Sequence, residues 1–123
     1  MQINFFDNPE DAPKSRDDVR IKQLGLYLFE DQMRVAVGFD ITPFLERPSI
    51  EVQLINERGE KAGSLHVIDT LDTNFSLTMH IRDKEPTDTY DVNVTLYYAT
   101  PETERANVQT MSRKLDRSII GNQ

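Results

Sequence analysis

The stretch that most constrains the fold is EPTDTYDVNVTLYY, in which a polar run ends at a tyrosine and strict alternation follows. One side of the resulting strand carries Tyr90, Val92, Val94, Leu96 and Tyr98, and the other carries Asp91, Asn93, Thr95 and Tyr97. In β-sandwiches, a tyrosine at the start of a long inner strand pins a crossing loop through its hydroxyl group. The stretch therefore predicts a sandwich in which Tyr90 has a structural role, and it predicts no activity.

Period-2 alternation of apolar residues recurs along the chain and indicates antiparallel strands with one buried face each. Besides the run at Tyr90, the predicted strands are 19–29, 34–41, 49–56, the return strand around 65–67, and 75–81. The first of them changes phase near Gln23 to Gly25, which predicts a bulge. Gly59 suits the left-handed position of a hairpin loop. With a short edge strand at residues 1–6, we expect about seven strands.

The end of the chain changes period. Thr100 suits a helix N-cap and Pro101 the first helical position. One helical stripe would then carry Val108, Met111, Leu115 and Ile119. The alternative is a last strand over Arg105–Leu115, which we rank second because neither of its alternating faces is apolar enough for the core. The predicted organisation is an N-terminal edge strand and acidic connector over 1–18, a β-sandwich domain over 19–100 and a C-terminal amphipathic helix over 101–123.

Residues 19–100 resemble the immunoglobulin-like and fibronectin type III-like β-sandwich superfamily. The resemblance rests on the order of predicted hairpins and on one motif, in which Pro86, Thr87, Tyr90, Val92 and Val94 open the strand after the crossing loop. The chain departs from antibody-type domains because it has neither cysteine nor tryptophan. The resemblance implies an all-β, immunoglobulin-like sandwich that binds or spaces other molecules, and it implies no catalytic residue.

Charge and composition exclude several partners. The formal net charge is −7, and no basic stripe is present to neutralise nucleic-acid phosphates. The same charge disfavours anionic membranes. The N-terminus lacks a basic region followed by an apolar run, and no apolar stretch reaches the roughly 20 residues that span a bilayer. We therefore expect a cytoplasmic protein, without cofactor, whose partner is another protein or a second copy of itself.

Acidic loop residues and two histidines are the candidate metal ligands. Asp69, Asp72 and Asn74 supply oxygen atoms that calcium prefers, as do Asp83, Glu85, Asp88 and Asp91. The loop spacing lacks the EF-hand pattern, and Asp and Asn also favour turns. His66 and His80, with Asp69 or Asp83, would form a site only if their strands pair. Calcium or small-ligand binding by these end loops is the alternative function.

A hydrolase is the least favoured interpretation. Ser64, His66 and Asp69 are close in sequence, but Ser64 and His66 alternate onto the same exposed side of one strand. No glycine-rich elbow or phosphate-binding loop accompanies them. The sequence therefore predicts a protein that is not an enzyme.

Apolar side chains on predicted outward faces indicate an interaction module. Large side chains gathered on an outer face mark contact surfaces more often than isolated ones do. The contact residues that we predict are Tyr27, Phe29 and Tyr97 on the strands and Met111, Leu115 and Ile119 on the apolar stripe of the helix. The alternative is that the helix covers an outer sheet face of its own subunit. The function predicted from sequence is thus a non-catalytic protein-interaction or accessory module that self-associates.

Overall fold

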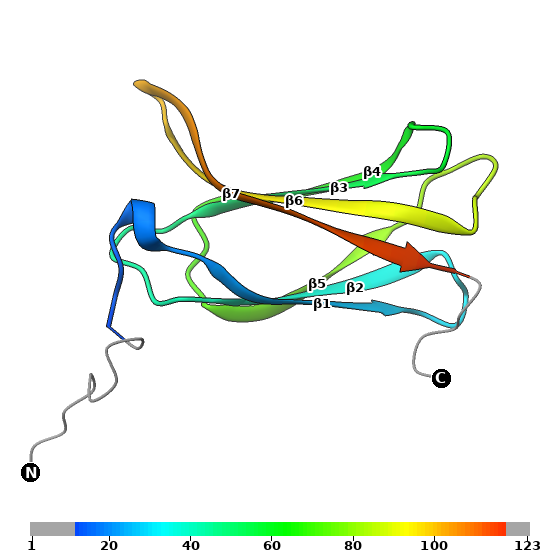
Figure 1. Ribbon diagram of the computed structural model, residues 1–123, viewed down its shortest axis with the longest axis horizontal. Coiled ribbons are helices and arrows are strands. Elements are labelled where there is room, and N and C mark those ends of the chain that lie inside the picture. The colour runs from blue at the N-terminus through cyan, green and yellow to red at the C-terminus, as the bar shows by residue number, and fades with distance from the viewer. Residues whose placement is uncertain (1–11, 118–123) are drawn as a thin grey trace, which may run out of the picture.

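The computed structural model describes residues 12–117, and within them the chain is all-β. A 3-10 turn, η2 (Arg16–Asp18), precedes seven strands. The strands are β1 (Ile21–Leu28), β2 (Arg34–Ile41), β3 (Ser49–Ile55), β4 (Lys61–Val67), β5 (Asn74–His80), β6 (Thr89–Thr100) and β7 (Thr103–Asp116). One sheet has the order β1-β2-β5 and the other the order β4-β3-β6-β7, with every pairing antiparallel. The two sheets lie face to face as a sandwich (Figure 1).

The core lies between the sheets and follows the alternation that the sequence predicts. The inward side chains of β2 are buried, and those of β3 and β6 are almost completely so. They are Val35, Val37, Phe39, Ile41, Ile50, Val52, Leu54, Tyr90, Val92, Val94 and Leu96. The outward neighbours on these strands are mostly polar or small, as expected for sheets with one wet face.

The C-terminal helix predicted over 101–123 is wrong for the residues that the structure describes, because these form strand β7. β7 pairs along β6, with Val94 opposite Met111 and Tyr90 opposite Leu115. The register shifts where Leu96 and Tyr97 face Gln109 and Asn107, so Val108 is an extra residue in β7. This bulge produces the spacing of three between Val108 and Met111 that imitates a helical stripe. Ile119 and residues 1–6 lie outside the described residues.

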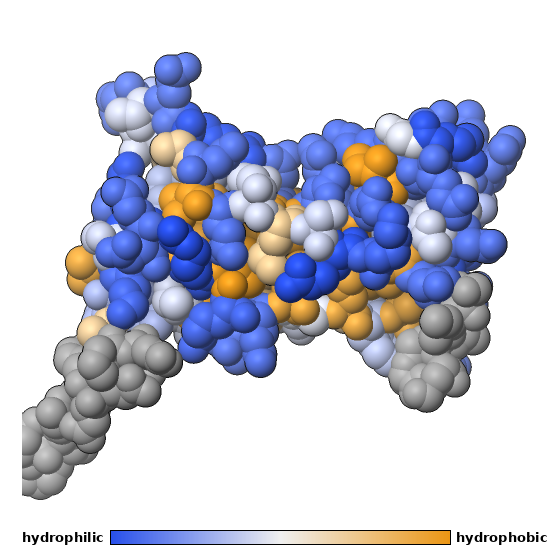
Figure 2. All heavy atoms as spheres, viewed as in Figure 1, coloured by the Kyte–Doolittle hydropathy of each residue, from blue (hydrophilic) through white to orange (hydrophobic). Residues whose placement is uncertain are grey.

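β1 and β7 lie along the same open side of the sandwich, where a band of apolar side chains is visible between the sheets (Figure 2). Polar contacts join the sheets across this side. The Gln109 side-chain oxygen accepts a hydrogen bond from the Ile21 N–H at 2.7 Å. Arg117 donates to the carbonyls of Gln32 and Thr87 at 3.1 and 3.0 Å. These contacts explain why an edge strand rich in polar residues belongs to the fold.

The predicted bulge in β1 and the predicted left-handed glycine are both present. The register of β1 against β2 shifts between Ile21 and Gln23, so Lys22 is the extra residue, just before the predicted position. Gly59 has φ of 84° in the loop between β3 and β4. After the bulge, Leu24 and Leu26 pack against the core, and Gln23, Gly25 and Tyr27 face outward.

Candidate functional site

Tyr90 ties the loop between β5 and β6 to the core. Its side chain is 1% exposed. The hydroxyl donates a hydrogen bond to Asp83 Oδ2 at 3.0 Å and accepts one from the Thr87 N–H at 3.2 Å. Burial and the neighbouring Asp83 carboxylate raise the pKa of the Tyr90 hydroxyl. Tyr90 therefore fixes two residues of the crossing loop, Asp83 and Thr87, to the core.

The hydrogen-bonded group around the Tyr90 hydroxyl is called the Tyr90 corner below, and the Asp83 carboxylate is its centre. Oδ2 also accepts from the Asn56 side-chain amide at 3.0 Å, and Oδ1 accepts from Arg58 Nη2 at 3.0 Å. The Glu85 N–H donates to Oδ1 at 3.2 Å. The hydrogen bond from Asn56 is the main reason that the pKa of Asp83 is lowered, with Tyr90, Glu85 and Arg58 adding to it. A carboxylate with four protein donors serves the fold and has little capacity left for a metal ion.

The structure does not bring the other predicted metal ligands together. His66 is on β4 and His80 on β5, in different sheets. In the Asp69–Asn74 loop, the Asp69 N–H donates to the Ser49 hydroxyl, and the Thr70 hydroxyl bridges the backbone of Asp72. Within residues 12–117, no group of three or more His, Asp or Glu side chains is arranged to hold a metal.

The residues considered for a hydrolase do not form a triad. His66 Nε2 lies 3.5 Å from Glu51, and its ring is T-shaped to the Tyr97 ring with 6.4 Å between the ring centres. Ser64 faces Gln53 across the strand pair, two residues from His66 on β4. No hydrogen bond between Ser64 and His66 occurs in the described part of the chain. Nucleophilic catalysis needs such a contact.

The predicted contact residues separate into covered and open ones. Leu115 is 6% exposed in the core, and Met111 packs against the same core. The ring of Tyr97 lies under the Arg105 guanidinium at 4.0 Å, and Arg105 pairs with Glu51 at 2.7 Å. These residues are used within the chain because β7 is a strand. The sequence could not show this, since the prediction for Met111 and Leu115 rested on a helix.

Tyr27 and Phe29 differ from that group. Tyr27 is 44% exposed, and its ring meets the Phe29 ring edge-on at 5.6 Å. Phe29 is half-buried beneath the Arg34 guanidinium, 4.4 Å from the ring centre. Both belong to the outer side of the β1-β2-β5 sheet, which we call the small-sheet face. Its outward residues are Gln23, Gly25, Tyr27, Phe29, Arg34, Ala36, Gly38, Asp40, Asn74, Ser76, Thr78 and His80.

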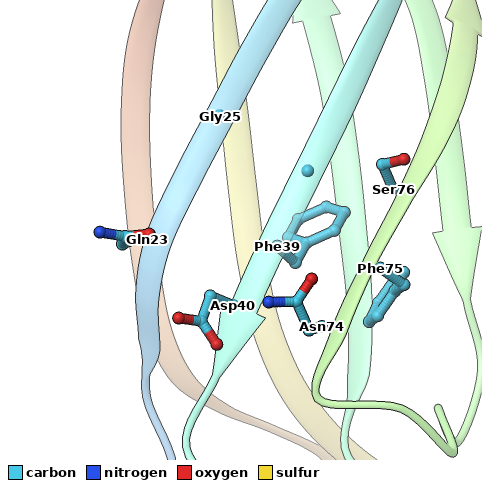
Figure 3. A pocket seen from close by; sticks show the side chains of 8 residues that line it. Gln23, Gly25, Phe39, Asp40, Asn74, Phe75 and Ser76 are labelled. Carbon is cyan, nitrogen blue, oxygen red and sulfur yellow. The ribbon is translucent and has the colours of Figure 1, made fainter.

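A shallow trough of about 340 Å³ crosses the small-sheet face. Its centre is one cross-strand row, in which Gly25 faces Gly38 and Gly38 faces Ser76. The neighbouring row of Gln23, Asp40 and Asn74 forms a polar rim (Figure 3). On the other side of the trough, the next outward row consists of Tyr27, Ala36 and Thr78.

The two glycines of the trough have no role in the backbone or in packing. Neither has a positive φ. A Cβ atom added at Gly25 would meet nothing within 4 Å, and one added at Gly38 would make ordinary contact with Ser76 at 3.8 Å. Glycine inside a strand costs about 0.5–1 kcal/mol relative to alanine, and often marks a place where a ligand or another backbone approaches closely. The sequence held a signal for this site, namely two outward glycines facing each other across one hairpin.

Comparisons with known proteins found similarity among solved structures. No family model and no curated protein matches the chain. Among solved structures, the apo and D-glucuronic acid-bound forms of a β-glucuronidase from Ruminococcus gnavus align with 80% of this chain. The identity is 11%, the TM-score is 0.45, and the chain spans about 16% of the enzyme's length. No helix in the described part of the chain is long and apolar enough to cross a membrane.

Proposed function

We propose that this chain is a non-catalytic interaction module, built on an immunoglobulin-like and fibronectin type III-like sandwich, whose contact surface is the small-sheet face. The strand order β1-β2-β5 against β4-β3-β6-β7 and the Tyr90 corner support the assignment of the sandwich. The partner is a protein surface that lies on the trough and on Tyr27.

The observation that carries the proposal is the pair of facing glycines. Gly25 and Gly38 lower the stability of two paired strands, and neither the backbone nor the packing of this chain requires them. An exposed aromatic ring, Tyr27, stands one row away. Aromatic side chains beside a hollow are typical of the centre of protein interfaces.

The glycine argument is tested by replacing both residues with threonine, which suits strands better. In the Gly25→Thr, Gly38→Thr variant, the new Cβ atom meets nothing at position 25 and makes ordinary contact at position 38, so we expect its melting temperature to rise by several degrees. Ala36→Thr on the next row of the face is the matched control, because it adds bulk at a position that is not glycine. A double variant that melts below the wild type would mean that the glycines serve the fold.

Contact is tested by photo-crosslinking in the cells that make the protein. A photoreactive phenylalanine analogue replaces Tyr27 on the small-sheet face or, as a control, Thr95 on the outer side of the other sheet. We expect a crosslinked protein product from position 27 and none from position 95. Products from neither position, or equally from both, would contradict the proposal.

A further inference from the structure

We infer that the partner of the small-sheet face is a second copy of this chain, packed face to face. The two-fold axis lies in the plane between the two faces and is perpendicular to the strands. This inference rests on the proposed function. In such a dimer β2 runs antiparallel to β2 of the other copy, and the axis passes at the level of Val37. The cross-strand row of Gly25, Gly38 and Ser76 then lies opposite the row of Tyr27, Ala36 and Thr78 of the other copy.

The shape of the face fits this arrangement. Tyr27 is the large exposed side chain next to the trough, and it sits one row from the glycines on the same strand. The two-fold axis places the Tyr27 ring of each copy above Gly25 of the other, so two protrusions fill two hollows. An isologous interface requires this kind of self-complementarity, because one patch must fit itself.

The charges on β2 select the direction of the axis. Arg34 and Asp40 lie at opposite ends of the outward side of β2. With the axis perpendicular to the strands, Arg34 of one copy meets Asp40 of the other, twice. An axis parallel to the strands would instead place Arg34 against Arg34 and Asp40 against Asp40, which is repulsive. Arg34 also pairs with Asp31 at 2.8 Å through Nε, which leaves its terminal nitrogen atoms for a second carboxylate.

The area of the small-sheet face limits the affinity of the proposed dimer. Three strands of about seven residues cover roughly 24 Å by 14 Å, or roughly 340 Å². A standard stable interface buries about 800 Å² on each partner. The dimer is therefore weak, and we expect a Kd between about 10 μM and 1 mM. The experiment must reach that concentration range.

The test uses two charge variants of the full chain, each shown to be folded by its own thermal melt, in sedimentation equilibrium. Asp40→Arg alone places the new arginine of one copy against Arg34 of the other at each contact. Arg34→Asp alone places the new aspartate of one copy against Asp40 of the other. We expect each variant to dimerise at least about tenfold more weakly than the wild type. In an equal mixture, a chain with arginine at both positions meets a chain with aspartate at both. We therefore expect the mixture to form a heterodimer about as strong as the wild-type dimer.

The control is Asp91→Arg on the outer side of β6, which changes the net charge as Asp40→Arg does but lies on the other sheet. It is expected to dimerise like the wild type, whereas Tyr27→Ala is expected to be monomeric. A wild-type chain that stays monomeric to about 1 mM overturns the inference, as does a mixture no stronger than its components. A crosslink from position 27 to a different protein would then preserve the proposed function while self-association fails.

Discussion

Removing the Tyr90 hydroxyl tests the corner that fixes the crossing loop. Tyr90→Phe keeps the buried ring, so the packing with the core is unchanged. The change deletes the hydrogen bond to the Asp83 carboxylate at 3.0 Å and leaves the Thr87 N–H without its acceptor. From the sequence alone, we would expect a loss of about 1 kcal/mol, the usual net value of one hydrogen bond.

The structure raises that expectation. The acceptor is a charged carboxylate, and hydrogen bonds to charged groups contribute about 1.5–3 kcal/mol. We therefore expect Tyr90→Phe to lower the free energy of unfolding by about 2 kcal/mol. Unfolding entropy is about 2.1 cal/mol/K per residue, or about 0.26 kcal/mol/K for the 123 residues of this chain. The melting temperature should then fall by about 8 °C.

The assay is thermal and urea unfolding, with Tyr98→Phe as the matched control. The Tyr98 hydroxyl donates to the Glu46 carbonyl at 2.9 Å, a neutral acceptor. Its loss should lower the melting temperature by about half as much as the loss of the Tyr90 hydroxyl. The reasoning is refuted if Tyr90→Phe melts within about 1 °C of the wild type, or if the two variants lose the same amount.

Three further predictions concern the same fold. Because the folded-state pKa of Asp83 lies below its ordinary value of 3.8, its carboxylate stabilises the fold above that range, and the contribution is lost as pH falls. Asp83→Asn should therefore unfold more easily at pH 7 and show a shallower loss of stability toward about pH 2 than the wild type in urea titrations at each pH. Leu115→Ala should cost about 2–4 kcal/mol in urea unfolding because the side chain is in the core, whereas Lys114→Ala should change little; equal effects would contradict the placement of β7. Calcium at about 5 mM should leave the melting temperature unchanged, and a rise of more than about 2 °C would restore the end loops as a ligand site.

The sandwich is predictable because its inner strands alternate along most of their length. The inward residues of β2, β3 and β6 each bury a side chain that the period-2 pattern marks as apolar. The bulge in β1 is predictable for the same reason, since a change of phase within one apolar run needs an extra residue. These features depend on local pattern, which a single sequence contains.

β7 is not predictable in this way, because it is an edge strand at the open side of the sandwich. Its inward positions include Gln109, whose side chain accepts a hydrogen bond from β1 and does not fill the core. The bulge at Val108 then shifts the apolar residues into a helix-like spacing. Whether a polar side chain on such a strand has a hydrogen-bond partner depends on the other sheet. The sequence around that side chain does not show whether such a partner exists.

The trough is not predicted from the sequence because glycine has several uses that look the same in a sequence. Gly59 needs its positive φ, and a Cβ at Gly63 would lie 2.9 Å from the His80 carbonyl, so both have reasons within the chain. Gly25 and Gly38 have neither reason, and they face each other on an outer surface. Because each of them weakens its own strand without a benefit inside the chain, we propose that they serve contact with a partner, which the experiments on the small-sheet face measure.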